Sequence, residues 1–316
     1  MDLYSKKYFL IFFLLLTLSS CEKETNVDIS GKPPKLVVLG EFNQEDEATI
    51  NLSTSAYSVA KGGFPDVEDA QVNLYDQNNS LIEKYTYKGK GNYTGKKAVT
   101  GLGYKLTVNY QGKAYNAETI IPTAFNLNIK SRDSNSLEAE ITDISRDINL
   151  YTFELIERPF TVDRYYLENG QKIKVNSEAE FTALLKLNPA LEAKRDTTFD
   201  SRFNRIYIGT TDSRTENVRY NVLNSETKRI FLTDKTFNGG TTTLVISFAE
   251  NALNQENKQY VLLAKSTSAV YFDYLYSMDL QEERAISGSL NVPIKGNIDN
   301  ALGIWGAAYI RKITIK

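Results

Sequence analysis

Two serine–lysine pairs have a spacing that could do chemistry. Ser58 precedes Lys61 and Ser225 precedes Lys228, and in the same S-x-x-K spacing of penicillin-recognising enzymes the lysine can activate the serine. The companion motifs S-D-N and K-T-G are absent, and serine and lysine are frequent enough here for two matches to arise by chance. The pairs therefore do not predict a serine–lysine enzyme.

The chain contains no histidine and a single cysteine, Cys21. Because histidine is the commonest general base near neutral pH and a frequent zinc ligand, this composition excludes Ser-His-Asp and Cys-His hydrolysis and histidine-ligated metal catalysis. Carboxylate pairs remain, such as Glu138 with Glu140 or Glu154 with Glu157. A glycosidase needs two carboxyl groups about 5–9.5 Å apart across a sugar. Residues two apart on a strand share one face, so a solvated strand face explains Glu138 and Glu140 better.

Two further motifs are better explained by turns. Gly89–Gly95 resembles a dinucleotide-binding loop, but its third glycine comes one residue late and no helix pattern follows. Asp76–Ser80 resembles a calcium loop but lacks the required glycine and distal glutamate. We therefore expect no catalytic residue, no metal and no cofactor.

One stretch mixes aromatic rings with guanidinium groups, a composition enriched at the cores of protein interfaces. Its candidate interaction residues are Phe199, Arg202, Phe203, Arg205, Tyr207, Arg214, Arg219 and Tyr220. The alternative is an ordinary strand pair with a polar outer face. The chain as a whole carries 37 basic and 39 acidic residues, a balance that argues against nucleic acid as a partner.

The N-terminus has the layout of a secretory signal. Lys6 and Lys7 precede an apolar run from residue 8 to residue 18, which is shorter than the about 20 residues that a membrane-spanning helix needs. The sequence Leu-Ser-Ser-Cys that ends at Cys21 resembles the bacterial lipobox, whose cysteine carries lipid. An ordinary signal peptide with a chance cysteine is the alternative. Residues 1–20 are thus predicted to be a lipoprotein signal peptide and residues 21–34 a lipidated tether.

The elements that would position these residues are mostly strands. Apolar residues alternate in Ala48–Leu52, Ala70–Leu74 and Tyr104–Tyr110, with turn residues between them. Further strands are predicted in these ranges: 35–40, 137–141, 151–155, 205–209, 219–223, 229–233, 243–248, 260–264 and 303 to the end.

Two segments have a helical pattern. Ser177 lies three residues before Glu180, the spacing of a capping box, which predicts a helix near 177–187. A second helix is predicted near 268–283, with Tyr271, Tyr274, Leu275 and Met278 on one stripe.

The predicted fold is mainly β. Residues 35–122 are expected to form an immunoglobulin-like or transthyretin-like antiparallel β-sandwich. Residues 123–316 are expected to form a larger antiparallel β domain, a sandwich or an open barrel, with one or two short helices. Trp305, the sole tryptophan, is expected in a core.

Several motifs resemble one family, the domain of unknown function 4249 family of Bacteroidota lipoproteins. They are Cys21–Glu24, Lys35–Phe42, Val67–Tyr75, Gly91–Gly95, Gly103–Val108, Ala117–Pro122, Asp234–Gly239 and Gly296–Gly306. The resemblance spans nearly all of the chain after Cys21. It implies a lipid-anchored, two-part β protein of the outer membrane, often encoded beside TonB-dependent transporters, and it brings no functional residues.

These observations lead to one main hypothesis of function. The protein is expected to be a non-enzymatic accessory or binding component of a TonB-dependent uptake system, anchored in the cell envelope by lipid on Cys21 at the surface or periplasmic face of the outer membrane. One alternative is a module whose C-terminal β unit encloses a small apolar or sugar ligand. A carboxylate-based glycosidase is a second alternative.

Overall fold

The computed structural model describes residues 33–55, 64–216, 227–287 and 292–315 of the 316-residue chain. The predicted signal peptide, Cys21, most of the tether, the pair Ser58 and Lys61, the strand 219–223, Arg219 and Tyr220 lie outside these residues. All the strands and helices described below belong to one compact unit, Lys35–Ser55 with Phe64–Lys316.

The first sheet comes from the N-terminal part of the chain and is fully antiparallel. Its strands are β3 (Gln71–Asp76), β4 (Leu81–Lys84), β7 (Gly103–Tyr110) and β8 (Lys113–Ile120), in the order β4-β3-β7-β8. The predicted turn at Asp76–Ser80 is confirmed, because the Asp76 carboxylate accepts from the backbone N–H groups of Asn78 and Ser80 at 2.8 Å.

A second, larger sheet joins both ends of the chain. Its main path is β12-β11-β18-β19-β1-β2-β6-β5, and β13, β14 and β16 also pair with β11. The strands are β1 (Leu36–Asn43), β2 (Ala48–Thr54), β5 (Thr86–Gly89), β6 (Asn92–Gly95), β11 (Leu150–Glu168), β12 (Gln171–Val175), β13 (Ala193–Phe199), β14 (Asn204–Ile206), β16 (Ile230–Thr233), β18 (Lys258–Thr267) and β19 (Leu302–Thr314). The Gly89–Gly95 segment makes the predicted turn between β5 and β6, with Gly89 and Gly91 at positive φ.

The pairing of β1 with β19 is parallel, with Val37 opposite Leu302, although the local patterns predict only antiparallel neighbours. The C-terminal strand therefore lies between β1 and β18 and connects strands from either side of residue 122. The division of the chain into domains at that residue stays a prediction.

A third sheet covers one face of the large one. Its strands are β9 (Phe125–Arg132), β10 (Ser136–Asp143), β15 (Ile208–Gly209) and β17 (Thr241–Phe248), in the order β15-β17-β10-β9. A core of fully buried side chains fills the space between the two sheets, including Tyr151, Phe153, Leu244 and Ile246.

Strand β11 is buried on both faces from Tyr151 to Leu155, because the third sheet packs on one face and a helix on the other. Because both faces are covered, the polar side chains of Thr152 and Glu154, which alternate with the apolar ones, are buried as well. At the other end of the large sheet, β1, β2 and β19 pack on the first sheet, with Trp305 fully buried in that core, as predicted.

Helix α2 (Glu178–Leu187) confirms the predicted capping pattern, since the Ser177 side chain accepts from the Glu180 N–H. Helix α3 (Ala269–Ser287) is the second predicted helix. Its packed residues are Tyr271, Phe272 and Leu275. The predicted stripe was wrong at Met278, which is exposed because the buried face turns toward Phe272 instead.

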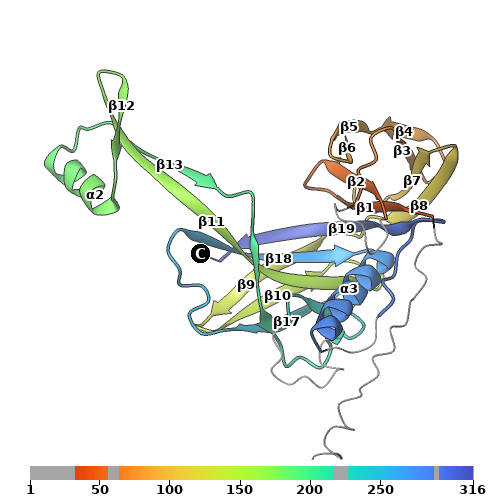
Figure 1. Ribbon diagram of the computed structural model, residues 1–316. Coiled ribbons are helices and arrows are strands. Elements are labelled where there is room, and N and C mark those ends of the chain that lie inside the picture. Colours follow the sequence, from red (N-terminus) through yellow and green to blue (C-terminus); the bar gives the residue numbers. More distant parts are fainter. Residues whose placement is uncertain (1–32, 56–63, 217–226, 288–291, 316) are drawn as a thin grey trace, which may run out of the picture. The chain divides into compact units, whose positions relative to one another are not determined.

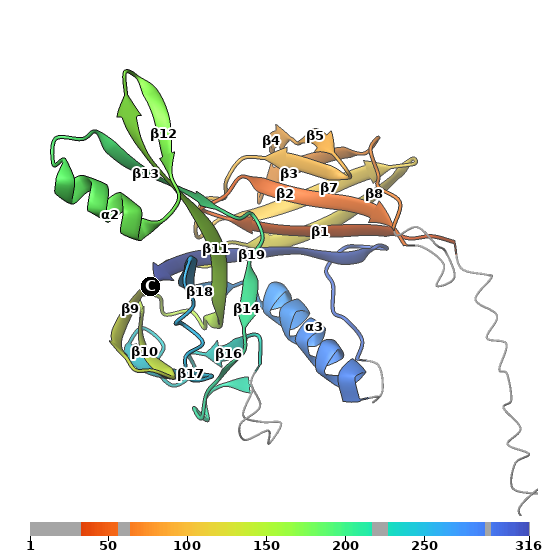
Figure 2. The ribbon, with the colours of Figure 1, turned by 60° about the vertical axis from the view of Figure 1, so that its left-hand side comes forward.

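The second half of β11 leaves the large sheet and forms an arm. Its residues 150–159 pair with β18, whereas 160–166 pair with β13 and 164–168 with β12. Figures 1 and 2 show β11, β12, β13 and α2 extending together beyond the end of β18. Arg195 lies over the ring of Phe181 and donates to Glu178, which fastens α2 to the arm.

Among the residues that the structure describes, none of the helices combines the length and apolar character needed to span a bilayer.

Candidate functional site

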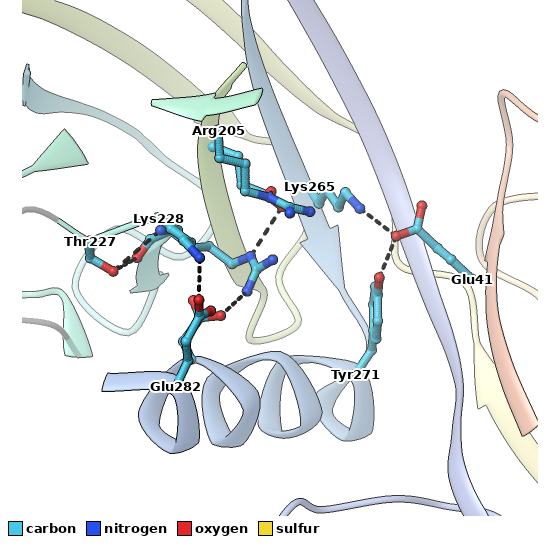
Figure 3. Close-up of polar contacts among 10 residues, drawn as sticks. Glu41, Arg205, Thr227, Lys228, Lys265, Tyr271 and Glu282 are labelled. Carbon is cyan, nitrogen blue, oxygen red and sulfur yellow. Dashed lines mark hydrogen bonds and ion pairs between the residues drawn. The ribbon is translucent and has the colours of Figure 1, made fainter. Parts of the chain in front are cut away.

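A chain of buried ion pairs lies between the large sheet and α3 (Figure 3). At its centre is Glu154 on β11, whose carboxylate accepts from Arg229 at 3.1 Å and from Arg205 on β14. Arg229 also donates to Asp279 on α3 at 2.7 Å. The side chains of Glu154 and Arg229 are almost completely buried. The network thus connects β11, in the interior of the large sheet, with β14 and α3.

A second group of polar contacts continues toward β1. Lys265 on β18 and the Tyr271 hydroxyl on α3 both donate to Glu41 on β1, the tyrosine at 2.5 Å. At the far end of α3, Lys228 donates to Glu282. Because burial of an ion is costly unless it is paired, the contacts of Tyr271 with Glu41 and of Asp279 with Arg229 favour one position of α3 on the sheet.

Burial and neighbouring charges shift the pKa values of three acids in opposite directions. Burial raises the pKa of Glu154, but the charges of Arg229, Lys265 and Arg205 outweigh it and lower that pKa to about 2. Burial likewise opposes the charge of Lys265 at Glu41, whose pKa is lowered. At Asp279 burial wins over the attraction of Arg229, and the pKa rises to about 6.

In this arrangement three of the carboxylates considered for a glycosidase are held in ion pairs. Glu154 is paired with two arginines, and Glu157 accepts from Lys258 at 2.5 Å. Glu140 is paired with Lys130 at 2.7 Å on the outer face of β10. In the described parts of the chain, no group of three or more acidic or cysteine side chains is placed to hold a metal ion.

The predicted aromatic and arginine residues fall into two places. Phe199, Phe203 and Tyr207 are exposed on the segment that runs from β13 through β14 to β15. A cation lies over each ring: Arg158 at 4.8 Å from the centroid of Phe199, Arg205 at 5.5 Å from Phe203 and Lys228 at 5.9 Å from Tyr207. With the exposed Arg202, these residues form what we call the aromatic–arginine surface.

Arg214 is not part of this surface. Its guanidinium is bound to Asp212 at 2.9 Å, donates to the Thr243 carbonyl and lies over Phe237. Arg205 belongs to both regions, because it stacks on Phe203 and also reaches the buried Glu154.

A cavity of about 650 Å³, which we call the cleft, lies between β8, the loop 144–149 and the start of α3. Apolar side chains from all three line it: Ile120, Ile148 and Val270. Sequence reasoning missed this site. Its lining includes the aromatic residue Tyr104 and none of the candidate interaction residues between Phe199 and Tyr220. The sequence signal that could have revealed the cleft was Ile148, an apolar residue within a polar loop.

Two buried carboxylates hold the loop 144–149 in place. Asp143 accepts from the N–H groups of Ser145 at 2.9 Å and Gly239 at 2.8 Å. Asp234 accepts from the N–H of Asn149 at 2.8 Å. The motif Asp234–Gly239 noted in the sequence is therefore a turn that fastens this loop.

Another motif of the family resemblance, Gly296–Gly306, also has a structural role. The Asn297 side chain accepts from the Trp305 N–H at 2.9 Å and donates to the Trp305 and Glu118 carbonyls. A Cβ on Gly306 would lie 2.2 Å from the ring of Tyr271, so only glycine leaves room for that ring beneath β19.

Comparisons with known proteins add little. No protein-family model matches the chain, and no curated protein is similar to it in sequence. Among solved structures, a DUF4785 family protein from Legionella pneumophila subsp. pneumophila str. Philadelphia 1 matches with a TM-score of 0.24 and 11% sequence identity. The match covers 72% of this chain and 50% of that protein, so the chain spans about half the length of its structural match. At this TM-score the similarity carries no argument about fold or function.

Proposed function

We propose that this protein is a non-enzymatic binding component of a bacterial cell envelope, held at the outer membrane by lipid on Cys21 and in contact with a TonB-dependent transporter. The lipobox-like sequence supports the anchor, and the resemblance to the domain of unknown function 4249 family supports the transporter. The observation that carries the binding role is the aromatic–arginine surface.

Three exposed rings within nine residues are unusual on a surface that serves only as a solvated strand face. Tyrosine and arginine are enriched among the residues that dominate binding energy, and rings already covered on one side by cations lose little side-chain entropy on binding. Phe199 lies at the end of β13 in the arm, whereas Phe203 to Tyr207 follow along β14, which pairs with β11 in the large sheet.

The anchor is tested first. Bacteria grown with labelled palmitate should incorporate the label into the wild-type chain and not into Cys21→Ser, which should leave the membrane fraction. Lipid on this cysteine supplies about 0.8 kcal/mol for each buried CH₂ group, so its loss should release the protein. Equal membrane association of both chains would contradict the anchor.

The partner is tested with the lipidated wild-type chain, captured in mild detergent and analysed by mass spectrometry. A TonB-dependent transporter should be recovered. Phe203→Ser should reduce its recovery about tenfold, the loss expected for one interface anchor. Val245→Ser on β17 is the matched control, since Phe203 and Val245 are 49% and 47% exposed. Recovery that is equal for both variants would assign the contact to another surface.

A further inference from the structure

The cleft has properties of a binding site that are independent of the aromatic–arginine surface and of the lipid on Cys21. Ile120 on β8 and Ile148 in the loop 144–149 are 64% and 62% exposed. Val270, at the start of α3, adds a third exposed apolar side chain. The volume of about 650 Å³ lies within the ~300–1,000 Å³ that is usual for ligand sites.

One wall of the cleft is an open strand edge. Strand β8 pairs with β7 on one side only. On its other side the carbonyl of Asn116 accepts from the Asp299 N–H at 2.9 Å, and the carbonyl of Glu118 accepts from the Asn297 side chain at 3.2 Å. In an antiparallel ladder the N–H and C=O groups of every second residue point to the same side of the strand. The N–H and C=O groups of Ile120, like those of Asn116 and Glu118, therefore face away from β7. The contacts of Asp299 and Asn297 cover this edge as far as Glu118. Ile120 lies beyond them and lines the cleft.

The loop 144–149, which also lines the cleft, is held rigidly. The N–H groups of Ser145 and Asn149 are bound by the buried carboxylates of Asp143 and Asp234. The exposed Ile148 is therefore presented on a loop whose backbone is fixed before any partner arrives. A fixed loop avoids the entropy cost of ordering on binding.

The charges around the cleft select among partners. Its lining includes three carboxylates, from Asp76, Glu118 and Asp147, and one ammonium group, from Lys105. Lys105 donates to the side chain of Asn79 at 3.3 Å. The surplus of negative charge favours a ligand with positive side chains.

We propose that the cleft binds an extended peptide segment of alternating apolar and basic residues, which adds to the edge of β8 at Ile120 and packs its apolar side chains against Ile148 and Val270. Backbone hydrogen bonds to the strand edge give such complexes affinity, and pockets for alternate side chains give them specificity. The carboxylates at the rim face the basic side chains.

The test uses the full-length mature chain and a fluorescein-labelled heptapeptide of alternating valine and lysine. Fluorescence anisotropy should show binding about tenfold tighter than for peptides that alternate valine with glutamate or serine with lysine. Methylation of the peptide's backbone nitrogens should weaken binding by a similar factor, because it removes the donors for β8. Equal binding of the methylated peptide, or of the valine–glutamate peptide, overturns the proposal.

Two variants locate the site. Ile148→Ser should weaken binding of the valine–lysine peptide about tenfold. Leu81→Ser on β4, a matched control at 49% exposure, should bind like the wild type. Equal affinities of the two variants overturn the proposal. A wild-type dimer in sedimentation that Ile148→Ser converts to a monomer also overturns it, because the occupant is then a second copy of the chain.

Discussion

Asp279 is the acid in the buried network whose charge is least favoured. Arg229 lies 2.7 Å away, yet burial and the neighbouring charge of Glu154 raise its pKa to about 6. Arg229 already donates to Glu154, so two carboxylates share it. The proton that Asp279 takes up near pH 6 therefore removes repulsion inside the network.

This pKa predicts a change of stability with pH. An acid whose pKa is higher when folded than when unfolded stabilises the fold at low pH, and this contribution is lost as the pH rises through the folded value. Relative to Asp279→Asn, the wild-type free energy of unfolding should fall by about 1–3 kcal/mol between pH 4 and pH 7. Urea unfolding at both pH values measures it.

The control is Asp273→Asn on the same helix, where the carboxylate pairs with Lys295 in an exposed position. It should leave the pH dependence of the wild type unchanged. If Asp279→Asn and the wild type instead lose stability in parallel between pH 4 and pH 7, Asp279 is not the group that titrates.

At the scale of elements, α3 lies on β19 where the strand has a glycine. The ring of Tyr271 occupies the space that a Cβ on Gly306 would need, and its hydroxyl donates to Glu41 on β1. One glycine thus allows the contact between helix and sheet and the hydrogen bond that holds it.

Gly306→Ala should destabilise the protein by about 1–3 kcal/mol, because the added methyl group forces the ring of Tyr271 out of its place. Adding Tyr271→Ala should then cost less than it does in the wild type, and denaturant unfolding of the four proteins of this cycle measures the coupling. Gly103→Ala is the control, since the nearest atom to its Cβ would be 3.7 Å away. Additive losses would mean that Gly306 acts independently of Tyr271.

The local elements could be read from the sequence wherever one strand or helix carries its own signal. The alternation in Tyr104–Tyr110 and the cap at Ser177 are such cases. The length of β11 could not be predicted from the sequence. Its second half pairs with β13 in the arm and has no face packed on a hydrophobic core, so it lacks a regular apolar pattern. The site at Glu154 was equally hidden, since nothing local shows that Arg229 and Asp279 come to meet it.

At the scale of the whole molecule, the C-terminal strand completes the N-terminal core. Trp305 on β19 is buried among residues of β1, β2 and the first sheet. It stacks on Phe42 with ring centroids 5.6 Å apart. A pattern of alternation cannot reveal this pairing, because it describes each strand without its partner.

A fragment of residues 35–122 should therefore be less stable than the same segment in the full chain. Joining residues 296–315 to it through a flexible linker should restore a cooperative transition, and the fluorescence of Trp305, the sole tryptophan, reports directly on that core. Circular dichroism provides the comparison for the fragment that lacks tryptophan. If the fragment 35–122 alone unfolds cooperatively and is as stable as the fragment joined to residues 296–315, β19 is dispensable for this core.

The parallel pairing of β1 with β19 can form only after Leu302 has been synthesised. Val37 emerges from the ribosome early, and its neighbour Leu302 only near the end. Contacts between such distant residues raise the contact order and slow folding. During that interval one edge of β1 stays open to other chains, so a holding chaperone bound to the nascent polypeptide should matter more for this protein than for one closed by local hairpins.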